Sequence, residues 1–289
     1  MSADSPPFTL RRLLLPNGAE IAFRQGGSGA LRLLYIHGLG SNMHTWHKNL
    51  PAVARRAQYA AVDLPGYGYS GTGDHPYTMP FFAECIEDLV QLLRWEEVVL
   101  VGHSMGGQVA LNVALRKRIR LRGLILLAPA GLERFREREK TLLRGLNTPM
   151  LFRRMKAEQI RRAISANFFR FPADAHSLIE QRIALREEPH FPAYCAMIAQ
   201  CVNAMLDQDL PPRLAEIDRP ALLLFGAQDA LIPNRLLHPT LTTKRLARRS
   251  ARRIRGSRLL MLEACGHFLH WECAGRVNQA ILKFMDEWS

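Results

Sequence analysis

A serine flanked by glycines has the clearest catalytic context in this sequence. The run Gly102-His103-Ser104-Met105-Gly106 follows the apolar segment 98–101 and precedes a segment of helical periodicity. The glycines allow a tight, strained turn from strand to helix, which exposes the serine hydroxyl above the carboxyl edge of a sheet. We therefore predict that Ser104 is a nucleophile and that the Met105 amide, at the positive end of the helix, stabilises an oxyanion.

A nucleophilic serine needs a base that accepts its proton and a third group that holds the base. Asp229 follows the apolar segment 222–225, and His267 follows the apolar segment 259–262. In open α/β sheets, active sites lie at the carboxyl ends of such strands. Serine, then aspartate, then histidine is also a known chain order of a catalytic triad. Ser104, Asp229 and His267 are therefore the predicted catalytic residues.

Two other residues compete for the acid and the base. Glu133, after the apolar segment 123–127, is the rival acid. His270 lies one helical turn after His267 and is a weaker candidate for the base. Asp229 and His267 remain the preferred pair.

The remaining polar motifs are predicted to be structural. A serine nucleophile needs one proton acceptor, so His37 and His103 are expected to fix loops rather than to take part in catalysis. The glycine-rich segment 63–70 has no lysine at the spacing of a phosphate-binding loop. We predict a packed turn there.

The elements that must position these residues form an α/β pattern. Continuous apolar runs predict buried strands at 31–36, 59–62, 98–101, 123–127, 221–225 and 259–262, and helical periodicity appears at 79–93, 105–115 and 277–288. Alternating strands and helices favour a mostly parallel sheet with helices on both faces. Asn17-Gly18, between segments 8–16 and 19–23, predicts an antiparallel hairpin at the sheet edge.

One stretch interrupts the alternation. Residues 131–217 are helix-like, basic, rich in aromatic residues and methionine, and broken by prolines. They are too many for an ordinary connection between strands. We expect a helical cap at 131–217, inserted in a core formed by residues 1–130 and 218–289.

Four stretches of the chain resemble the α/β-hydrolase superfamily. They are the oxyanion loop His37-Gly38-Leu39-Gly40, the loop 63–70, the nucleophile elbow 102–106, and Gly266-His267-Phe268 followed by Glu272, Val277 and Asn278. Each is weak evidence alone, but they occur in the family's order and span nearly the whole chain.

The resemblance implies a role for each candidate residue. Ser104 would be the nucleophile, His267 the general base and acid, and Asp229 the residue that orients His267. The amides of Leu39 and Met105 would form the oxyanion hole. A serine nucleophile argues against dehalogenase or epoxide hydrolase chemistry, which in similar proteins depends on aspartate.

We therefore expect a serine esterase or lipase-like enzyme that cleaves a carboxylic ester of a fairly apolar acyl substrate through an acyl-enzyme. Such chemistry requires no cofactor and no metal. One alternative is hydrolysis of a carbon–carbon bond in a dienone acid, as in relatives with this triad and a cap. Another is a ligand-binding or receptor protein that retains the triad.

The charge of the chain is concentrated in three segments. The formal net charge is +13, and segment 244–258 alone holds eight basic residues and no acidic one. Segments 116–122 and 133–162 are also strongly basic. Such charge usually serves solubility. Beyond the small ester, an acidic acyl carrier protein, a carboxylated substrate or a lipid surface would suit it, whereas no nucleic-acid-binding motif is present.

Cysteine use and hydropathy indicate a cytoplasmic protein. The five cysteines contain no C-x-x-C pair and predict neither a disulfide framework nor a zinc site. The polar residues 1–7 do not resemble a secretory signal, and no apolar run is long enough to cross a membrane.

Overall fold

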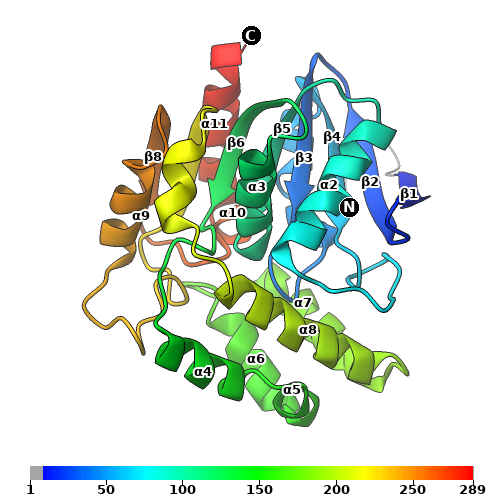
Figure 1. Cartoon of the computed structure of the whole chain (residues 1–289), viewed down its shortest axis with the longest axis vertical. Coiled ribbons are helices and arrows are strands. Elements are labelled where there is room, and N and C mark those ends of the chain that lie inside the picture. The colour runs from blue at the N-terminus through cyan, green and yellow to red at the C-terminus, as the bar shows by residue number, and fades with distance from the viewer. Residues whose placement is uncertain (1–8, 289) are drawn as a thin grey trace.

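One eight-stranded sheet forms the centre of the protein (Figure 1). The computed structural model describes residues 9–288. The strands are β1 (Thr9–Leu14), β2 (Glu20–Gly27), β3 (Leu31–Ile36), β4 (Ala57–Asp63), β5 (Val98–His103), β6 (Leu121–Leu127), β7 (Ala221–Gly226) and β8 (Ser257–Leu262). Their order in the sheet is β1-β2-β4-β3-β5-β6-β7-β8. Only the β1–β2 and β2–β4 pairs are antiparallel, which confirms the predicted mostly parallel sheet.

All six apolar runs form strands, but the prediction of burial is wrong for the last one. Every residue of β5 and β7 is buried, because these strands have neighbours on both sides and helices on both faces. β8 alternates exposed with half-buried residues up to the buried Leu262. It lies at the edge of the sheet, where one side has no neighbouring strand.

The predicted hairpin is also present at the opposite edge. β1 pairs with β2 from Thr9 opposite Gln25 to Leu14 opposite Glu20, around the Asn17-Gly18 turn. Gly18 has φ of 81°, the left-handed conformation that glycine adopts readily. Residue 8, where the hairpin was expected to begin, and residues 1–7 lie outside the described residues.

Helices cover both faces of the sheet. The helices of the described residues are α1 (Leu50–Val53), α2 (Met79–Leu92), α3 (Met105–Arg116), α4 (Glu137–Leu146), α5 (Pro149–Arg154), α6 (Ala157–Ser165), α7 (His176–Ala184), α8 (Phe191–Leu206), α9 (Thr243–Ala251), α10 (Leu269–Glu272) and α11 (Ala274–Met285). In Figure 1, α2 and α3 lie in front of the sheet and α11 lies behind it. The last helix begins three residues before the predicted start, at Ala274, and residues 286–288 form a 3-10 turn.

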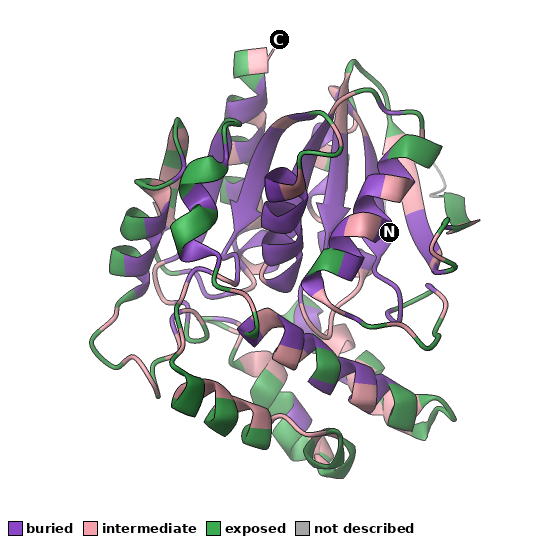
Figure 2. Cartoon of the chain, viewed as in Figure 1, coloured by how far each residue is buried: buried purple, intermediate pink, exposed green. Residues whose placement is uncertain are grey.

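The chain between β6 and β7 is helical. Helices α4 to α8 lie beyond the carboxyl edge of the parallel strands, at the lower end of Figure 1. Among the helices α4 to α8, α8 carries most of the buried residues, and it packs against α2, α4 and α5. By contrast, α4 and α5 have no buried residue, as their green and pink colouring in Figure 2 shows.

Segment 63–70 is a packed turn, as predicted. The buried Asp63 carboxylate accepts hydrogen bonds from the amides of Met43 (2.6 Å) and Tyr69 (2.8 Å). A side chain at Gly68 would collide with that carboxylate. Burial raises the pKa of Asp63 to about 6. The turn joins β4 to the loop after β3 and thereby fixes the sheet edge on which the candidate site is built.

Candidate active site

Ser104 lies in a strained turn between β5 and α3. Its φ of 52° and ψ of −119° are unusual for a residue with a side chain. A side chain at Gly102 would place its Cβ 2.5 Å from the Gly106 carbonyl oxygen, and one at Gly106 would lie 2.3 Å from the Ile36 oxygen. Both glycines are therefore required, because no larger residue fits beside the turn.

The loop after β3 packs against this turn. A Cβ built on Gly38 would lie 3.1 Å from the Cβ of Ser104 and 2.9 Å from Nδ1 of His103. Leu39 and Ser104 line the same cavity, and Met105 is buried as the first residue of α3. The structure thus brings the predicted nucleophile together with the loop that holds the first of its two expected oxyanion donors.

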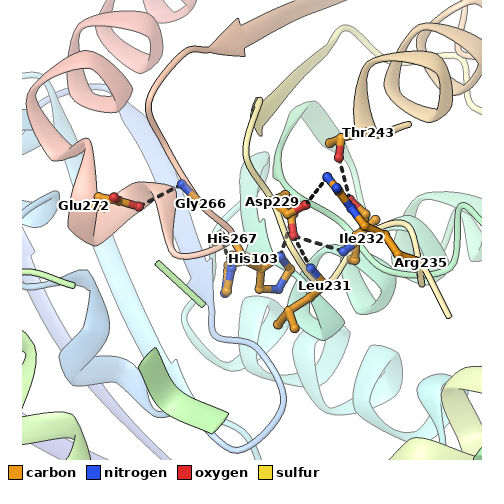
Figure 3. Close-up of polar contacts among 9 residues, drawn as sticks. All are labelled: His103, Asp229, Leu231, Ile232, Arg235, Thr243, Gly266, His267 and Glu272. Atoms are coloured by element: carbon orange, nitrogen blue, oxygen red, sulfur yellow. Dashed lines mark hydrogen bonds and ion pairs between the residues drawn. The ribbon is translucent and has the colours of Figure 1, made fainter. Parts of the chain in front are cut away.

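His267 and Asp229 meet at the ends of β8 and β7. Nδ1 of His267 donates a hydrogen bond of 2.8 Å to Oδ2 of Asp229, and both side chains are buried (Figure 3). The other carboxylate oxygen accepts from the amides of Leu231 (2.8 Å) and Ile232 (3.0 Å). Three donors therefore hold the carboxylate in place, and the hydrogen bond on Nδ1 leaves Nε2 of His267 available as a proton acceptor.

The loop that carries His267 is anchored on both sides. Glu272 accepts hydrogen bonds from the amides of Gly266 (2.8 Å) and, in the segment after α6, Phe169 (3.1 Å). Cys265 and Cys273 form a disulfide around the same loop. The sequence predicted no disulfide framework, and the prediction is wrong for this pair because the folded turn brings the two thiols together. Cys85, Cys195 and Cys201 are free and buried.

Glu133, the rival acid, forms its hydrogen bonds with residues other than His267. Oε1 of Glu133 accepts hydrogen bonds from Nδ1 of His238 (2.7 Å) and from the amide of Asn234 (2.9 Å). Burial raises the pKa of Glu133 above its ordinary value. The hydrogen-bonded carboxylate partner of His267 is therefore Asp229.

Three further histidines, His37, His103 and His270, are buried near the candidate site. Nδ1 of His37 donates to the Gly38 carbonyl (2.8 Å) and its Nε2 accepts from the Leu64 amide (3.1 Å). Nε2 of His103 donates to the His267 carbonyl (3.0 Å), which steadies the backbone of the candidate base. Neither ring nitrogen of His270 has a hydrogen-bond partner among residues 9–288.

Acidification is expected to destabilise the fold through these histidines. Burial lowers the pKa of His37 to about 4 and that of His270 to about 3, from an ordinary 6.5. Below pH 6.5 the unfolded chain binds these protons while the folded chain does not, so the free energy of unfolding falls by about 3 to 5 kcal/mol per histidine as the pH approaches the folded pKa. Asp63 opposes this loss, because its raised pKa lets the folded chain bind a proton that the unfolded chain does not. It restores about 3 kcal/mol of the free energy of unfolding between pH 6 and pH 4.

Urea unfolding at about pH 7.5 and about pH 5 measures this effect. His37, His270 and Asp63 together should give a loss of about 2 to 3 kcal/mol at the lower pH, of which His270→Phe should recover about 2 kcal/mol. Burial also lowers the pKa of His103, which adds to the loss. An exposed histidine substitution, His176→Phe, is the control. Equal stability of the unmodified protein at the two pH values would contradict the prediction.

A cavity of about 930 Å³ lies between the sheet edge and the helices α4 to α8. Leu39, Ser104 and His267 line it from the sheet side. The helical side contributes apolar and aromatic residues, among them Ile164, Phe168, Tyr194 and Met205, and also polar and charged ones. This volume is typical of a site for a small ligand.

Arg182 of α7 also lines the cavity, although the sequence did not predict a role for it. Its guanidinium hydrogen-bonds to the Gly40 carbonyl, next to Leu39, and lies 5.3 Å from the centre of the Tyr194 ring. Among the residues described, no carboxylate forms an ion pair with it. Only the packing of α7 against the loop after β3 distinguishes it from the many other arginines of the chain.

The fold and this edge of the sheet define an α/β hydrolase, and sequence comparison agrees. Residues 32–274 match the family model of the alpha/beta hydrolase fold, so the chain belongs to this family. It is 30% identical over 258 residues to a pimeloyl-(acyl-carrier protein) methyl ester esterase from Neisseria meningitidis, covering 84% of this chain and 90% of that protein.

The chain is also similar to a relative with a different name and to a solved esterase structure. The chain is 29% identical over 282 residues to the dihydrolipoyllysine-residue acetyltransferase component of the acetoin cleaving system from Pseudomonas putida, covering 93% of this chain and 69% of that protein. A thermophilic esterase from Thermogutta terrifontis has a similar structure, with a TM-score of 0.78, 24% identity and coverage of 96% and 98% of the two chains. At this identity the structural likeness supports the fold alone.

Residues 9–288 contain no helix with the length and hydrophobicity that crossing a membrane requires. Nor do three or more His, Cys, Asp or Glu side chains gather there in a way that could hold a metal ion.

Proposed function

We propose that this α/β hydrolase cleaves carboxylic esters with a fairly apolar acyl group, using Ser104 as the nucleophile. The observation that carries the proposal is the buried hydrogen bond of 2.8 Å between His267 and Asp229, in a cavity that Ser104 and His267 both line. The family membership supports hydrolysis, and the name of the esterase relative supports an ester substrate.

The proposed reaction follows the roles of a serine triad. Oγ of Ser104 attacks the ester carbonyl carbon while Nε2 of His267 takes its proton. The amides of Leu39 and Met105 stabilise the resulting oxyanion. His267 then gives the proton to the leaving alcohol, and water, activated by the same imidazole, releases the acid from Ser104.

We assign residues 131–217 to a helical cap over a core of residues 1–130 and 218–289. The aromatic and aliphatic side chains of α6 to α8 in the cavity suit an acyl chain rather than a polar one. An acyl group carried by an acidic acyl carrier protein is a candidate form of the substrate, in keeping with the name of the Neisseria relative.

A series of 4-nitrophenyl esters from acetate to decanoate tests the proposal. We expect kcat/KM to rise with chain length until the cavity is filled and then to fall. A fluorophosphonate probe should label the protein at Ser104, and labelling should be lost in Ser104→Ala but kept in Ser28→Ala, a serine exposed at the opposite end of the sheet. Labelling of another residue, together with no hydrolysis of the esters, would contradict the proposal.

Arg182 favours one second candidate, the hydrolysis of a carbon–carbon bond in a dienone acid. A guanidinium without an ion-pair partner in the cavity would suit a substrate carboxylate, which such acids carry and simple esters lack. In that reaction water would add across the bond between a carbonyl carbon and its neighbour, giving two products and consuming no other reactant. Absorbance loss of a vinylogous diketone acid without cleavage of esters would favour this candidate.

Arg182→Gln is expected to separate carboxylated from neutral substrates. Loss of a charge-assisted hydrogen bond should raise KM for a carboxylated substrate about 10- to 100-fold. For a neutral ester of equal length we expect a change of less than about threefold, because only the bond to Gly40 and the contact with the Tyr194 ring are removed. Steady-state kinetics measure both values, and Arg186→Gln, one turn further along the chain, is the control. Equal losses on both substrates would contradict a role in recognising carboxylates.

A further inference from the structure

Helices α4 and α5 present large apolar side chains to solvent. Leu142 and Leu146, one turn apart on α4, are 47% and 52% exposed, and Met150 and Leu151, in the first turn of α5, are 54% and 47% exposed. We call these four residues the α4–α5 ridge. Side chains of this size are normally packed, and four of them around one helix connection form an exposed patch that indicates an interaction surface.

Cations without partners flank the ridge. Arg138, Arg153, Arg154, Lys156 and Arg161 are exposed and form no ion pair with any residue from 9 to 288. The acidic residues of the same stretch are already engaged: Glu137 with Lys140, Glu158 with Arg162, and Glu133 and Glu139 with His238. The positive charge around the ridge is therefore not neutralised within the described chain.

We propose that the α4–α5 ridge docks on a lipid bilayer that contains anionic lipids. Aliphatic side chains at helix surfaces enter the boundary between headgroups and acyl chains, while neighbouring arginines bind lipid phosphates. The two helices lie at the end of the molecule away from the sheet (Figure 1). A bilayer accepts a projecting ridge, whereas a folded protein partner would need a groove of matching shape.

Docking at this surface would bring the cavity close to the membrane. Lys140 of α4 and Asn147, in the α4–α5 connection, line the cavity from the inside. An apolar acyl chain held in the bilayer would then have a short path to Ser104. The inference concerns binding and goes beyond the proposed function, so it can be tested without any hydrolysis.

The basic face of α9 provides a matched control surface. Lys244, Arg245, Arg248 and Arg252 are exposed on it, but it carries no exposed large apolar side chain. If the protein bound a bilayer through positive charge alone, both the ridge and the basic face of α9 would contribute to binding. If it binds through the ridge, removing charges from α9 should leave binding unchanged.

Sedimentation with lipid vesicles tests the proposal. We expect the protein to sediment with phosphatidylcholine vesicles that contain about 30% phosphatidylglycerol and to stay in solution with pure phosphatidylcholine. Arg153→Ala/Arg154→Ala should bind about 30-fold more weakly, and Leu146→Gln/Met150→Gln at least about tenfold more weakly. Arg248→Ala/Arg252→Ala should bind within about threefold of the unmodified protein.

Several outcomes would overturn the proposal. These are no binding to anionic vesicles, unchanged binding of the Leu146/Met150 variant, or an equal loss with the α9 variant. Tighter, ridge-dependent binding to an immobilised acidic acyl carrier protein than to vesicles would assign the ridge to a protein partner instead. All variants should keep the thermal midpoint and the short-ester activity of the unmodified protein, because none of these residues is buried or lines the cavity.

Discussion

Replacement of Ser104 by alanine should lower kcat for ester hydrolysis by about a million-fold. The hydroxyl is the only group in the proposed reaction that forms a bond to the acyl carbon, so its loss removes the acyl-enzyme route altogether. Alanine keeps a Cβ in the same strained turn, and the backbone bonds of residue 104 to Leu127 (3.0 Å) and Ala130 (3.0 Å) do not involve the hydroxyl. The fold should therefore be unchanged.

Burst kinetics and thermal unfolding measure the two halves of this prediction. The unmodified protein should release one equivalent of nitrophenol rapidly from a slowly deacylated ester, and Ser104→Ala should release none. Ser28→Ala should behave as the unmodified protein does, because Ser28 is exposed far from the carboxyl edge of the sheet. Ser104→Ala with more than about a tenth of the original kcat would refute the assignment.

Asp229→Asn should lower kcat by about ten-thousand-fold, the second-largest effect. Oδ2 of Asp229 accepts the proton on Nδ1 of His267, which directs Nε2 toward the substrate. An asparagine can keep the bonds from Leu231 and Ile232 through its carbonyl oxygen, but its amide nitrogen would then face Nδ1. His267 would be held in the wrong tautomer, and the imidazolium formed in the reaction would lose its counter-charge.

Two variants give this experiment its controls. Glu263→Gln removes an exposed carboxylate just after β8 and should leave kcat unchanged. Glu133→Gln tests the rival acid, which binds His238, and should cost at least about a hundredfold less than Asp229→Asn. If Glu133→Gln lowered kcat more than Asp229→Asn did, the acid would have to be reassigned to Glu133. If both retained activity, the triad itself would be refuted.

Local patterns were sufficient to predict the sheet and the turn at Ser104. The glycines at 102 and 106 lie where backbone atoms leave no room for a Cβ. The spacing of the motif therefore follows from a steric requirement of the turn itself. The apolar runs predict strands because a strand that is buried on both faces needs apolar residues at consecutive positions. The exposure of β8 was not predictable in this way, since it depends on the position of the strand in the sheet order.

Among the features that escaped prediction, Arg182 and the Glu133–His238 pair depend on contacts between distant segments, whereas the disulfide depends on a local turn. Arg182 reaches Gly40 only because α7 lies over the loop after β3. The Cys265–Cys273 disulfide depends on the turn that joins β8 to α10, and sequence spacing carries no signal for it. The Glu133 partner, His238, belongs to the loop that follows β7.

The position of the helical segment between two adjacent strands has a consequence for chain entropy. β6 and β7 pair directly, although roughly 90 residues separate them, where an ordinary crossover needs about a dozen. Loop-closure entropy grows only with the logarithm of length, so the longer connection costs about 2 kcal/mol more. The sheet can therefore tolerate extensive replacement of these helices at little thermodynamic cost, which would allow substrate preference to diverge while the sheet edge that carries Ser104, Asp229 and His267 stays intact.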